Sequence, residues 1–244
     1  MLTPPKIDNE TRKAITKRKR VLERFTPLME EHVQIPETDV TFAVTRPQSV
    51  DALLDLVMDD PEQNLPYWAE IWPSGIALAT TLLQNPELVC ERPTIELGSG
   101  IGITAAAALM AGANLTITDY SGESVLLAEI TCLRAGQKIP HSRQLNWRDA
   151  NAPLLQDSDE QWPVVLAADV LYEQRDIEPV LDVLDRITAP DGIVILAEPG
   201  RRPAREAIAL ALKRGWRIET RQHSGPWPDA KERDTTVFVH SMRR

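Results

Sequence analysis

The residues with the clearest chemistry in this 244-residue chain are three closely spaced glycines with an acid just before them. Gly98, Gly100 and Gly102 follow Glu96 and lie between an apolar run and an alanine-rich run. The pattern predicts a strand over 93–98, a tight turn and a helix, because glycine permits the turn and alanine favours the helix. The free N–H groups at the helix start would face a ligand held in the turn.

The acid decides which ligand suits this turn. A dinucleotide-binding turn has its third glycine at the position that Ile103 occupies here. Glu96 would repel a pyrophosphate but would attract a cation, and S-adenosyl-L-methionine carries both a sulfonium and an ammonium. The spacing therefore favours S-adenosyl-L-methionine as the cofactor, with S-adenosyl-L-homocysteine as the product. A glycine-rich turn without a ligand is the alternative.

A second acid closes the next apolar segment, Leu115–Asp119, about twenty residues beyond the first glycine. A carboxylate at the end of the second strand accepts hydrogen bonds from both ribose hydroxyls of a nucleoside. Asp119 and its neighbour Tyr120 are therefore expected at the cofactor. A helix N-cap or turn aspartate is the alternative, since Ser121 and Gly122 follow.

Two further strand ends supply candidates, because ligands of open α/β sheets bind at the carboxyl ends of the strands. After the third strand, Trp147 is expected against the adenine and Asp149 near its amino group, or Asp149 is simply a turn acid. The fourth strand ends at Ala168 and Asp169, and burying that carboxylate is costly unless it is used or paired. Asp169 is expected to face the methionine end of the cofactor or an incoming amine, with Tyr172 lining the acceptor channel.

An aromatic cluster lies in the segment Leu65–Gly75, in a chain with only 5% aromatic residues. Trp72 and its neighbours either pack in the core or form an aromatic wall beside the transferred methyl group, where they would suit a cationic donor or a lysine stem. The loops 60–75, 173–176, 199–203 and 222–234 are expected to line the acceptor channel. The role of Glu198–Gly200, at the end of the fifth strand, stays open.

The order of the expected elements predicts an α/β fold. The expected strands are 93–98, 114–119, 142–146, 164–168, 192–197, 216–221 and 235–240, with helices at 101–112, 122–135, 176–188 and 203–213. Alternating strands and helices predict a Rossmann-like, mostly parallel seven-stranded sheet with helices on both faces. The last two strands have no helix between them and therefore form an antiparallel hairpin. Residues 1–60 are expected as an N-terminal helical extension and 61–244 as the main domain.

The N-terminal region is less regular in pattern. Residues 1–11 are polar and expected to be disordered. Residues 12–24 hold seven basic residues and one acid and predict a helix with a basic outer face, either simply solvated or a docking surface for an acidic partner or RNA. Pro27 is expected to bend or end that helix, or to begin a second one. A strand is expected at 40–44, and a helix follows from Ser49 or Asp51.

Bulk composition excludes several classes. The net charge of −9 disfavours a protein that grips nucleic acid over its whole surface. The two cysteines form no metal or disulfide pattern, which fits a reducing cytoplasm, and the four scattered histidines make a metal improbable. The chain shows no secretory signal and no run that would cross a membrane. The oligomeric state is not readable.

The E-x-G-x-G-x-G form resembles motif I of the class I methyltransferases. More specifically, the chain resembles the seven-β-strand methyltransferases of the family-16 (METTL21-like) protein-lysine group. The matching stretches are Pro66–Gly75, Glu96–Gly102, Asp119, Leu145–Trp147 and Asp169–Tyr172, within roughly residues 64–200. The Asp-x-x-Tyr form at 169–172 and the upstream Trp-Pro are the more specific signals. The chain looks closest to bacterial members and to relatives that methylate the electron-transfer flavoprotein β-subunit, although Glu70 departs from the latter.

The expected function is S-adenosylmethionine-dependent N-methylation of a protein lysine side chain by in-line displacement. The expected cofactor-binding residues are Trp72, Glu96, Gly98, Ser99, Gly100, Gly102, Asp119, Tyr120, Trp147, Asp149 and Ala168, and the expected catalytic residues are Asp169 and Tyr172. The alternatives are a small-molecule N-methyltransferase, a nucleic-acid methyltransferase and a non-catalytic binder. The Asn-Pro-Pro-Tyr element of base-amino methylases is absent, with Asp169–Tyr172 in its place.

Overall fold

A computed structural model describes residues 7–50, 53–54, 62, 64–136, 138–156, 160–228, 230 and 232–244. The disorder expected over residues 1–11 is wrong for residues 9–11, which begin a helix that Asp8 caps. Residues 1–6 and most of the helix expected after Ser49 fall outside the described set. Seven strands form the central sheet, in the order β5-β4-β3-β6-β7-β9-β8. The strands are β3 (Pro93–Leu97), β4 (Asn114–Asp119), β5 (His141–Gln144), β6 (Trp162–Ala168), β7 (Thr188–Glu198), β8 (Arg217–Ser224) and β9 (Thr236–Arg243).

The sheet is parallel from β5 to β7, and β9 runs antiparallel to both of its neighbours. This confirms the mostly parallel sheet and the C-terminal hairpin. The chain order reverses at β3, since β4 lies on one side of it and β6 on the other. Ligands bind at such a switch point, beyond the carboxyl ends of the strands.

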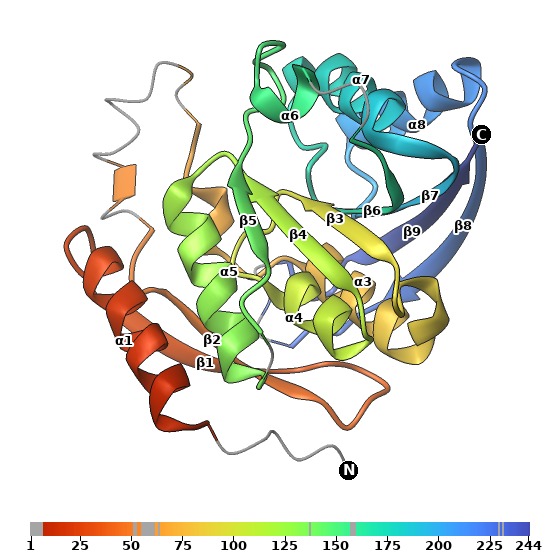
Figure 1. Cartoon of the computed structure of the whole chain (residues 1–244). Coiled ribbons are helices and arrows are strands. Elements are labelled where there is room, and N and C mark those ends of the chain that lie inside the picture. Colours follow the sequence, from red (N-terminus) through yellow and green to blue (C-terminus); the bar gives the residue numbers. More distant parts are fainter. Residues whose placement is uncertain are drawn as a thin grey trace.

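Helices cover both faces of the sheet (Figure 1). The helices α3 (Pro73–Gln84), α4 (Ile103–Met110) and α5 (Gly122–Arg134) bury their apolar residues in one core against the sheet. The helices α6 (Pro153–Gln156), α7 (Ile177–Ile187) and α8 (Arg202–Lys213) form the core on the opposite face. Central strands such as β6 are apolar on both sides for this reason, which explains their continuous hydrophobic sequence.

The N-terminal elements pack on α5. They comprise α1 (Asn9–Leu22), β1 (Leu28–Gln34) and β2 (Thr41–Pro47), of which the two strands form an antiparallel hairpin. Asp8 caps α1 by accepting a hydrogen bond from the Thr11 N–H at 2.7 Å. Ile15 and Leu22 enter the core shared with α4 and α5, and Arg18 pairs with Glu129 of α5 at 2.5 Å.

The structure differs from the sequence expectations at the end of α1. Helix α1 ends at Leu22, several residues before Pro27, and strand β1 starts at Leu28. The strand was not expected, because its residues Met29–Gln34 are mostly polar and only Val33 is fully buried. Pairing with β2, rather than an apolar pattern of its own, holds β1 extended.

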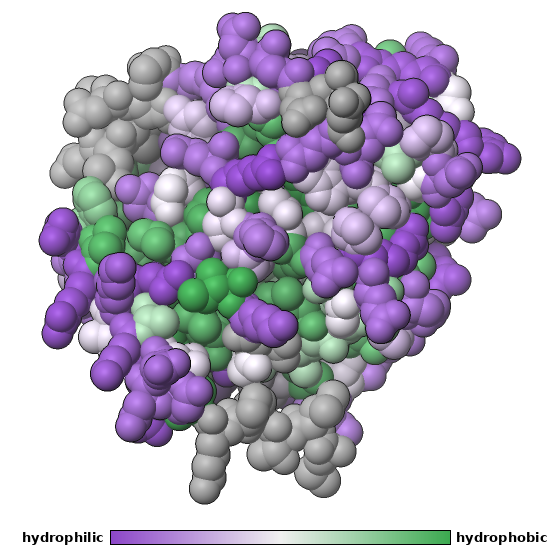
Figure 2. Space-filling view, in the orientation of Figure 1, coloured by the Kyte–Doolittle hydropathy of each residue, from purple (hydrophilic) through white to green (hydrophobic). Residues whose placement is uncertain are grey.

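Four of the basic residues of α1 face outward. Hydrophilic side chains follow the helix along the left edge of the space-filling view, while apolar side chains gather near the middle, in the region that α4 and α5 occupy (Figure 2). Arg12, Lys13, Lys17 and Arg20 are exposed, and within the described part of the chain no ion pair of these four is found. A cationic surface therefore lies on an otherwise acidic protein.

The close approach of α4 to α5 predicts a sharp contrast between two glycine substitutions. Gly102 has φ +84°, and a Cβ there would lie 2.5 Å from the Cα of Ala128 in α5. Gly102→Ala should therefore lower the free energy of unfolding by about 2–4 kcal/mol, because both strain and overpacking arise. Gly122→Ala, where a Cβ would meet nothing within 4 Å, should change it by less than about 0.5 kcal/mol. Urea unfolding of both variants measures this, and equal destabilisation would contradict the packing.

Candidate functional site

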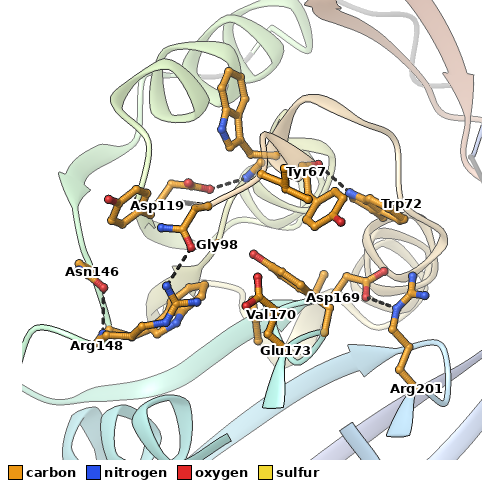
Figure 3. A pocket seen from close by; sticks show the side chains of 18 of the residues that line it. Tyr67, Trp72, Gly98, Asp119, Asn146, Arg148, Asp169, Val170, Glu173 and Arg201 are labelled. Atoms are coloured by element: carbon orange, nitrogen blue, oxygen red, sulfur yellow. Dashed lines mark hydrogen bonds and ion pairs between the residues drawn. The ribbon is translucent and has the colours of Figure 1, made fainter. Parts of the chain in front are cut away.

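A cavity of about 750 Å³ opens at the carboxyl ends of β3, β4 and β6. Its lining residues are Asn64, Leu65, Tyr67, Trp68, Trp72, Gly98, Gly100, Asp119, Tyr120, Asn146, Trp147, Arg148, Ala168, Asp169, Val170, Tyr172, Glu173, Arg201 and Glu232. Asp119 and Asp169 lie on opposite sides of it in Figure 3, with Tyr67 between them. The volume is within the range of small-molecule sites.

The glycine turn forms the floor between the two acids. Gly98 has φ +68°, and a Cβ there would come within 2.9 Å of the Val170 side chain. The Gly100 N–H donates a hydrogen bond to Asp119 Oδ2 at 2.9 Å, so the second strand end holds the turn in place. Gly102 stands behind the turn as the N-cap of α4 and is not a lining residue. Its packing against Ala128 sets the position of the turn.

Asp119 is held by backbone donors at the end of β4. Its Oδ1 accepts the Ser121 N–H at 3.0 Å, in addition to the Gly100 contact. Burial raises the pKa of Asp119, and these hydrogen bonds oppose the rise. These contacts fix the two carboxylate oxygens at the cavity, as a ribose diol requires of its acceptor. Tyr120 also lines the cavity.

Glu96 lies beneath the turn instead of in the lining. The side chain is 1% exposed, and burial raises its pKa well above the usual range, with the nearby Asp119 adding to the effect. Its Oε2, like the Ser99 Oγ, is buried without a hydrogen-bond partner among the described residues. Unpartnered buried acceptors cost free energy, so a group that donates hydrogen bonds or carries positive charge at the turn would stabilise them.

The segment after β5 forms one end of the cavity. The Trp147 Nε1–H and the Arg148 Nε–H both donate to Asp176 Oδ1, at 2.8 and 2.7 Å. Asp176 is completely buried, and it fixes the indole at the cavity wall. Arg148 also pairs with Glu62 at 2.5 Å. Asp149 does not reach the cavity lining: its Oδ1 accepts the Asn151 N–H at 2.9 Å in a turn.

Asp169 forms the opposite end, directly after Ala168 of β6. Its backbone has φ +56°, which is unusual for a residue other than glycine, and its N–H donates to the Ala197 carbonyl at 2.9 Å. Its Oδ2 accepts a hydrogen bond from Ser74 Oγ at 3.2 Å. Burial raises the pKa of Asp169 to about 6, and Arg201, 3.6 Å away, opposes the rise.

Three aromatic side chains of the cavity lining contact one another near Asp169. The Trp72 Nε1–H donates to the Tyr67 carbonyl at 2.8 Å, and the two rings meet edge to face with centroids 6.0 Å apart. Tyr67 makes a similar contact with Tyr172 at 5.4 Å. Burial raises the pKa of Tyr172, so its hydroxyl stays protonated at neutral pH. This part of the cavity therefore combines aromatic walls with a buried carboxyl group.

Several lining residues were not identified from the sequence. Arg201 and Glu232 lie in the expected channel loops 199–203 and 222–234, but no pattern singles out these two side chains. Asn64 and Arg148 are likewise polar residues in irregular segments. Their position depends on loop conformation. Their only sequence signal is a place in an expected channel loop or, for Arg148, after a strand end.

The site suits S-adenosylmethionine on grounds of the chain's own chemistry. Gly98 and Gly100 leave the room that a Cβ would fill, and Asp119 offers fixed acceptors. Nine of the expected residues line the cavity together, namely Trp72, Gly98, Gly100, Asp119, Tyr120, Trp147, Ala168, Asp169 and Tyr172. Their individual roles stay predictions.

The fold is that of solved methyltransferase structures. One solved structure with this fold is the magnesium protoporphyrin IX methyltransferase from Synechocystis with bound S-adenosylmethionine (TM-score 0.53, 16% identity, covering 78% of this chain and 85% of that one). Another is the O-methyltransferase from Bacillus cereus with S-adenosylhomocysteine (TM-score 0.54, 12% identity, covering 100% of this chain and 94% of that one). Residues 55–213 match the family described as lysine methyltransferase, and the chain belongs to that family.

The curated relatives of this chain are also named lysine methyltransferases. The electron transfer flavoprotein β-subunit lysine methyltransferase of Danio rerio is 30% identical over 143 residues (56% of this chain and 51% of the relative), and the Homo sapiens protein of that name is 35% identical over 113 residues (45% and 39%). The protein N-lysine methyltransferase METTL21A of Danio rerio is 28% identical over 158 residues (62% and 69%). The chain therefore spans about half the length of the Danio rerio flavoprotein-directed relative, and less of the Homo sapiens one.

Two further features are absent from the residues that the structure describes. No helix there is long and apolar enough to cross a membrane. Within the same part of the chain, no group of three or more His, Cys, Asp or Glu side chains is arranged to hold a metal ion.

Burial of Asp169 predicts that removal of its charge raises the stability of the folded protein, although the charge is expected to serve activity. The unfolded chain releases the Asp169 proton near pH 4 but the folded chain holds it to about pH 6, so the folded state loses stability as pH rises between these values. Asp169→Asn should therefore raise the free energy of unfolding at pH 7.5 by about 1–3 kcal/mol, with asparagine well tolerated at positive φ.

Thermal unfolding at pH 7.5, 5 and 3.5 measures this effect. The difference between wild type and Asp169→Asn should shrink at pH 5 and vanish at pH 3.5. The exposed Asp191, at the far end of β7, supplies the control: Asp191→Asn should alter stability by less than about 0.5 kcal/mol. A destabilised Asp169→Asn at pH 7.5 would contradict the argument.

Proposed function

We propose that the protein transfers a methyl group from S-adenosylmethionine to the side-chain amine of a lysine in a protein. The observation that carries the proposal is the buried Asp169 carboxylate beside the Tyr67, Trp72 and Tyr172 rings, across the cavity from Asp119. Membership of the lysine methyltransferase family and the names of the relatives support it.

The proposed cofactor position follows from the fixed groups at the strand ends. Asp119 would accept the ribose hydroxyls, the Gly98–Gly100 turn would pass close to the ligand, and Trp147 would lie against the adenine. When bound, S-adenosylmethionine supplies a methyl group on a sulfonium, which an amine attacks in line.

The chain's own task is to present a neutral amine. A lysine ammonium with its usual pKa of about 10.4 costs about 4–5 kcal/mol to deprotonate at pH 7. The apolar walls from Tyr67, Trp72 and Tyr172 disfavour a charged amine, because burial lowers the pKa of an ammonium. Asp169, with a pKa raised to about 6, would orient the amine and pass its proton toward solvent. Positioning supplies most of the acceleration in such a transfer.

The proposal includes a protein partner and a reducing compartment. The exposed basic residues of α1 would attract an acidic segment of the substrate protein. Cys90 and Cys132 are both unpaired, which is compatible with the proposed cytoplasmic location.

The ribose role of Asp119 predicts a loss of cofactor affinity. Asp119→Ala should weaken S-adenosylhomocysteine binding by about tenfold or more, since each hydrogen bond to a charged group contributes about 1.5–3 kcal/mol. Isothermal titration of the protein measures the affinity. Asp191→Ala, a substitution of an exposed acid remote from the cavity, is the control and should bind like wild type. Because Asp119 also holds Gly100 and Ser121, circular dichroism must show that the variant is folded. Unchanged affinity in folded Asp119→Ala would refute the assignment.

Labelled methyl transfer tests the proposed acceptor class. The protein is incubated with labelled S-adenosylmethionine and an extract, which is then divided into protease-treated, nuclease-treated and small-molecule fractions. Label that resists nuclease and disappears with protease is expected, and Asp169→Asn should reduce it by about 10²-fold or more through loss of the orienting carboxylate. Label confined to the small-molecule or nucleic-acid fraction would overturn the lysine proposal.

A further inference from the structure

The Arg201 side chain occupies the acidic end of the cavity. It follows the turn after β7, where the Gly200 N–H donates to Glu198 Oε2 at 2.5 Å, and it is the N-cap residue of α8. Its guanidinium lies over the Trp72 ring, 5.6 Å from the centroid. Its Nε is 3.6 Å from Asp169 Oδ1, and Figure 3 shows the two side chains facing each other across this distance.

The groups around Arg201 are those that would bind a lysine ammonium. A buried carboxylate and an aromatic face stabilise any cation between them, and both belong to the cavity lining. Glu232 supplies a second carboxylate, with two contacts of 3.0 Å to the Arg201 guanidinium. Arg201 and an incoming ammonium cannot share Asp169 without like-charge repulsion.

Arg201 makes closer contacts with Glu232 than with Asp169. The 3.6 Å separation from Asp169 is an ion-pair distance and too long for a hydrogen bond. Its Nε is buried without a hydrogen-bond partner in the described part of the chain. The geometrically good contacts are those with Glu232, whose side chain is 37% exposed. Arg201 is therefore held firmly at the cavity entrance and loosely at the inner carboxylate.

We propose that Arg201 is a built-in occupant of the acceptor's cation site and that the substrate ammonium displaces it from Asp169 and Trp72. This inference rests on the proposed function, since it assigns the site to an ammonium-bearing acceptor. Arg201 remains attached to Glu232 at the entrance while the acceptor takes its inner position. An amine that cannot displace the guanidinium is excluded, so Arg201 contributes to substrate selection.

The competing explanation is a fixed positioning role, in which Arg201 stays beside Asp169 throughout and orients it. The two explanations predict different changes in the affinity for a competing cation when Arg201 is replaced. Removal of an occupant strengthens the binding of a competing cation, whereas removal of a positioning group weakens it or leaves it unchanged.

The experiment is a titration of the S-adenosylhomocysteine-loaded protein with n-butylammonium at pH 7.5, followed by NMR chemical shifts of the tryptophan indole N–H groups. Arg201→Gln should bind n-butylammonium about tenfold more tightly than wild type, which corresponds to about 1.4 kcal/mol. Arg201→Lys, which keeps the charge, should bind close to wild type. Arg202→Gln is the matched control, because Arg202 is the exposed neighbour whose partner is Glu206.

Weaker or unchanged n-butylammonium binding to Arg201→Gln would overturn the exchange, and so would tight binding to Arg201→Lys. The affinity of each variant for S-adenosylhomocysteine, measured first, shows that the variants are folded. The titration needs no methyl transfer. Tighter binding to Arg201→Gln without labelled protein in the extract would therefore contradict the lysine acceptor alone, whereas labelled protein with unchanged binding would contradict the exchange alone.

Discussion

Burial of carboxylates at the carboxyl ends of the parallel strands is the constraint on which the site depends. Glu96, Asp119 and Asp169 belong to or directly follow three adjacent strands, and burial raises the pKa of each of them. Negative charge in a poorly solvated place is unfavourable unless donors or cations meet it. The three acids are compensated to different degrees. Asp119 accepts hydrogen bonds from two backbone donors, whereas Asp169 has Ser74 and the more distant Arg201. One oxygen of Glu96 has no hydrogen-bond partner among the described residues.

This uneven compensation divides the cavity into two chemical halves. At the Asp119 end the acceptors are fixed and the wall is an indole that Asp176 holds in place, which suits a nucleoside. At the Asp169 end the carboxyl group has a pKa of about 6 and aromatic rings lie beside it, which suits an amine that must lose a proton. The glycine turn joins the halves because its backbone passes between them without side chains.

The scaffold behind the site explains why these positions are rigid. Gly102 lets α4 approach the backbone of α5, and both helices begin at the strand ends that carry the acids. The N-terminal elements add a further layer on α5 through Ile15, Leu22 and the Arg18–Glu129 pair. Movement of α5 would shift Asp119 relative to the turn, so packing remote from the cavity contributes to its geometry.

Local patterns in the sequence determined the parts of this protein that depend on neighbouring residues. The strand–turn–helix around Gly98, the acids that close apolar strands and the final hairpin follow from periodicity and from glycine and alanine chemistry. The resemblance to the protein-lysine methyltransferases, carried by the glycine motif and by Asp169–Tyr172, was likewise present in the sequence and agrees with the family match.

Tertiary structure alone decided which residues meet across loops. Strand β1 is polar and exists because β2 pairs with it, so no periodic signal announced it. Asp149 resembles Asp119 as an acid after a strand, yet its turn directs it to Asn151 instead of the cavity lining. Arg201 and Glu232 lie 31 residues apart and meet over Trp72 and Asp169 only after α8 and the hairpin have folded back on the sheet. Contacts of that kind depend on long-range packing, which local periodicity does not encode.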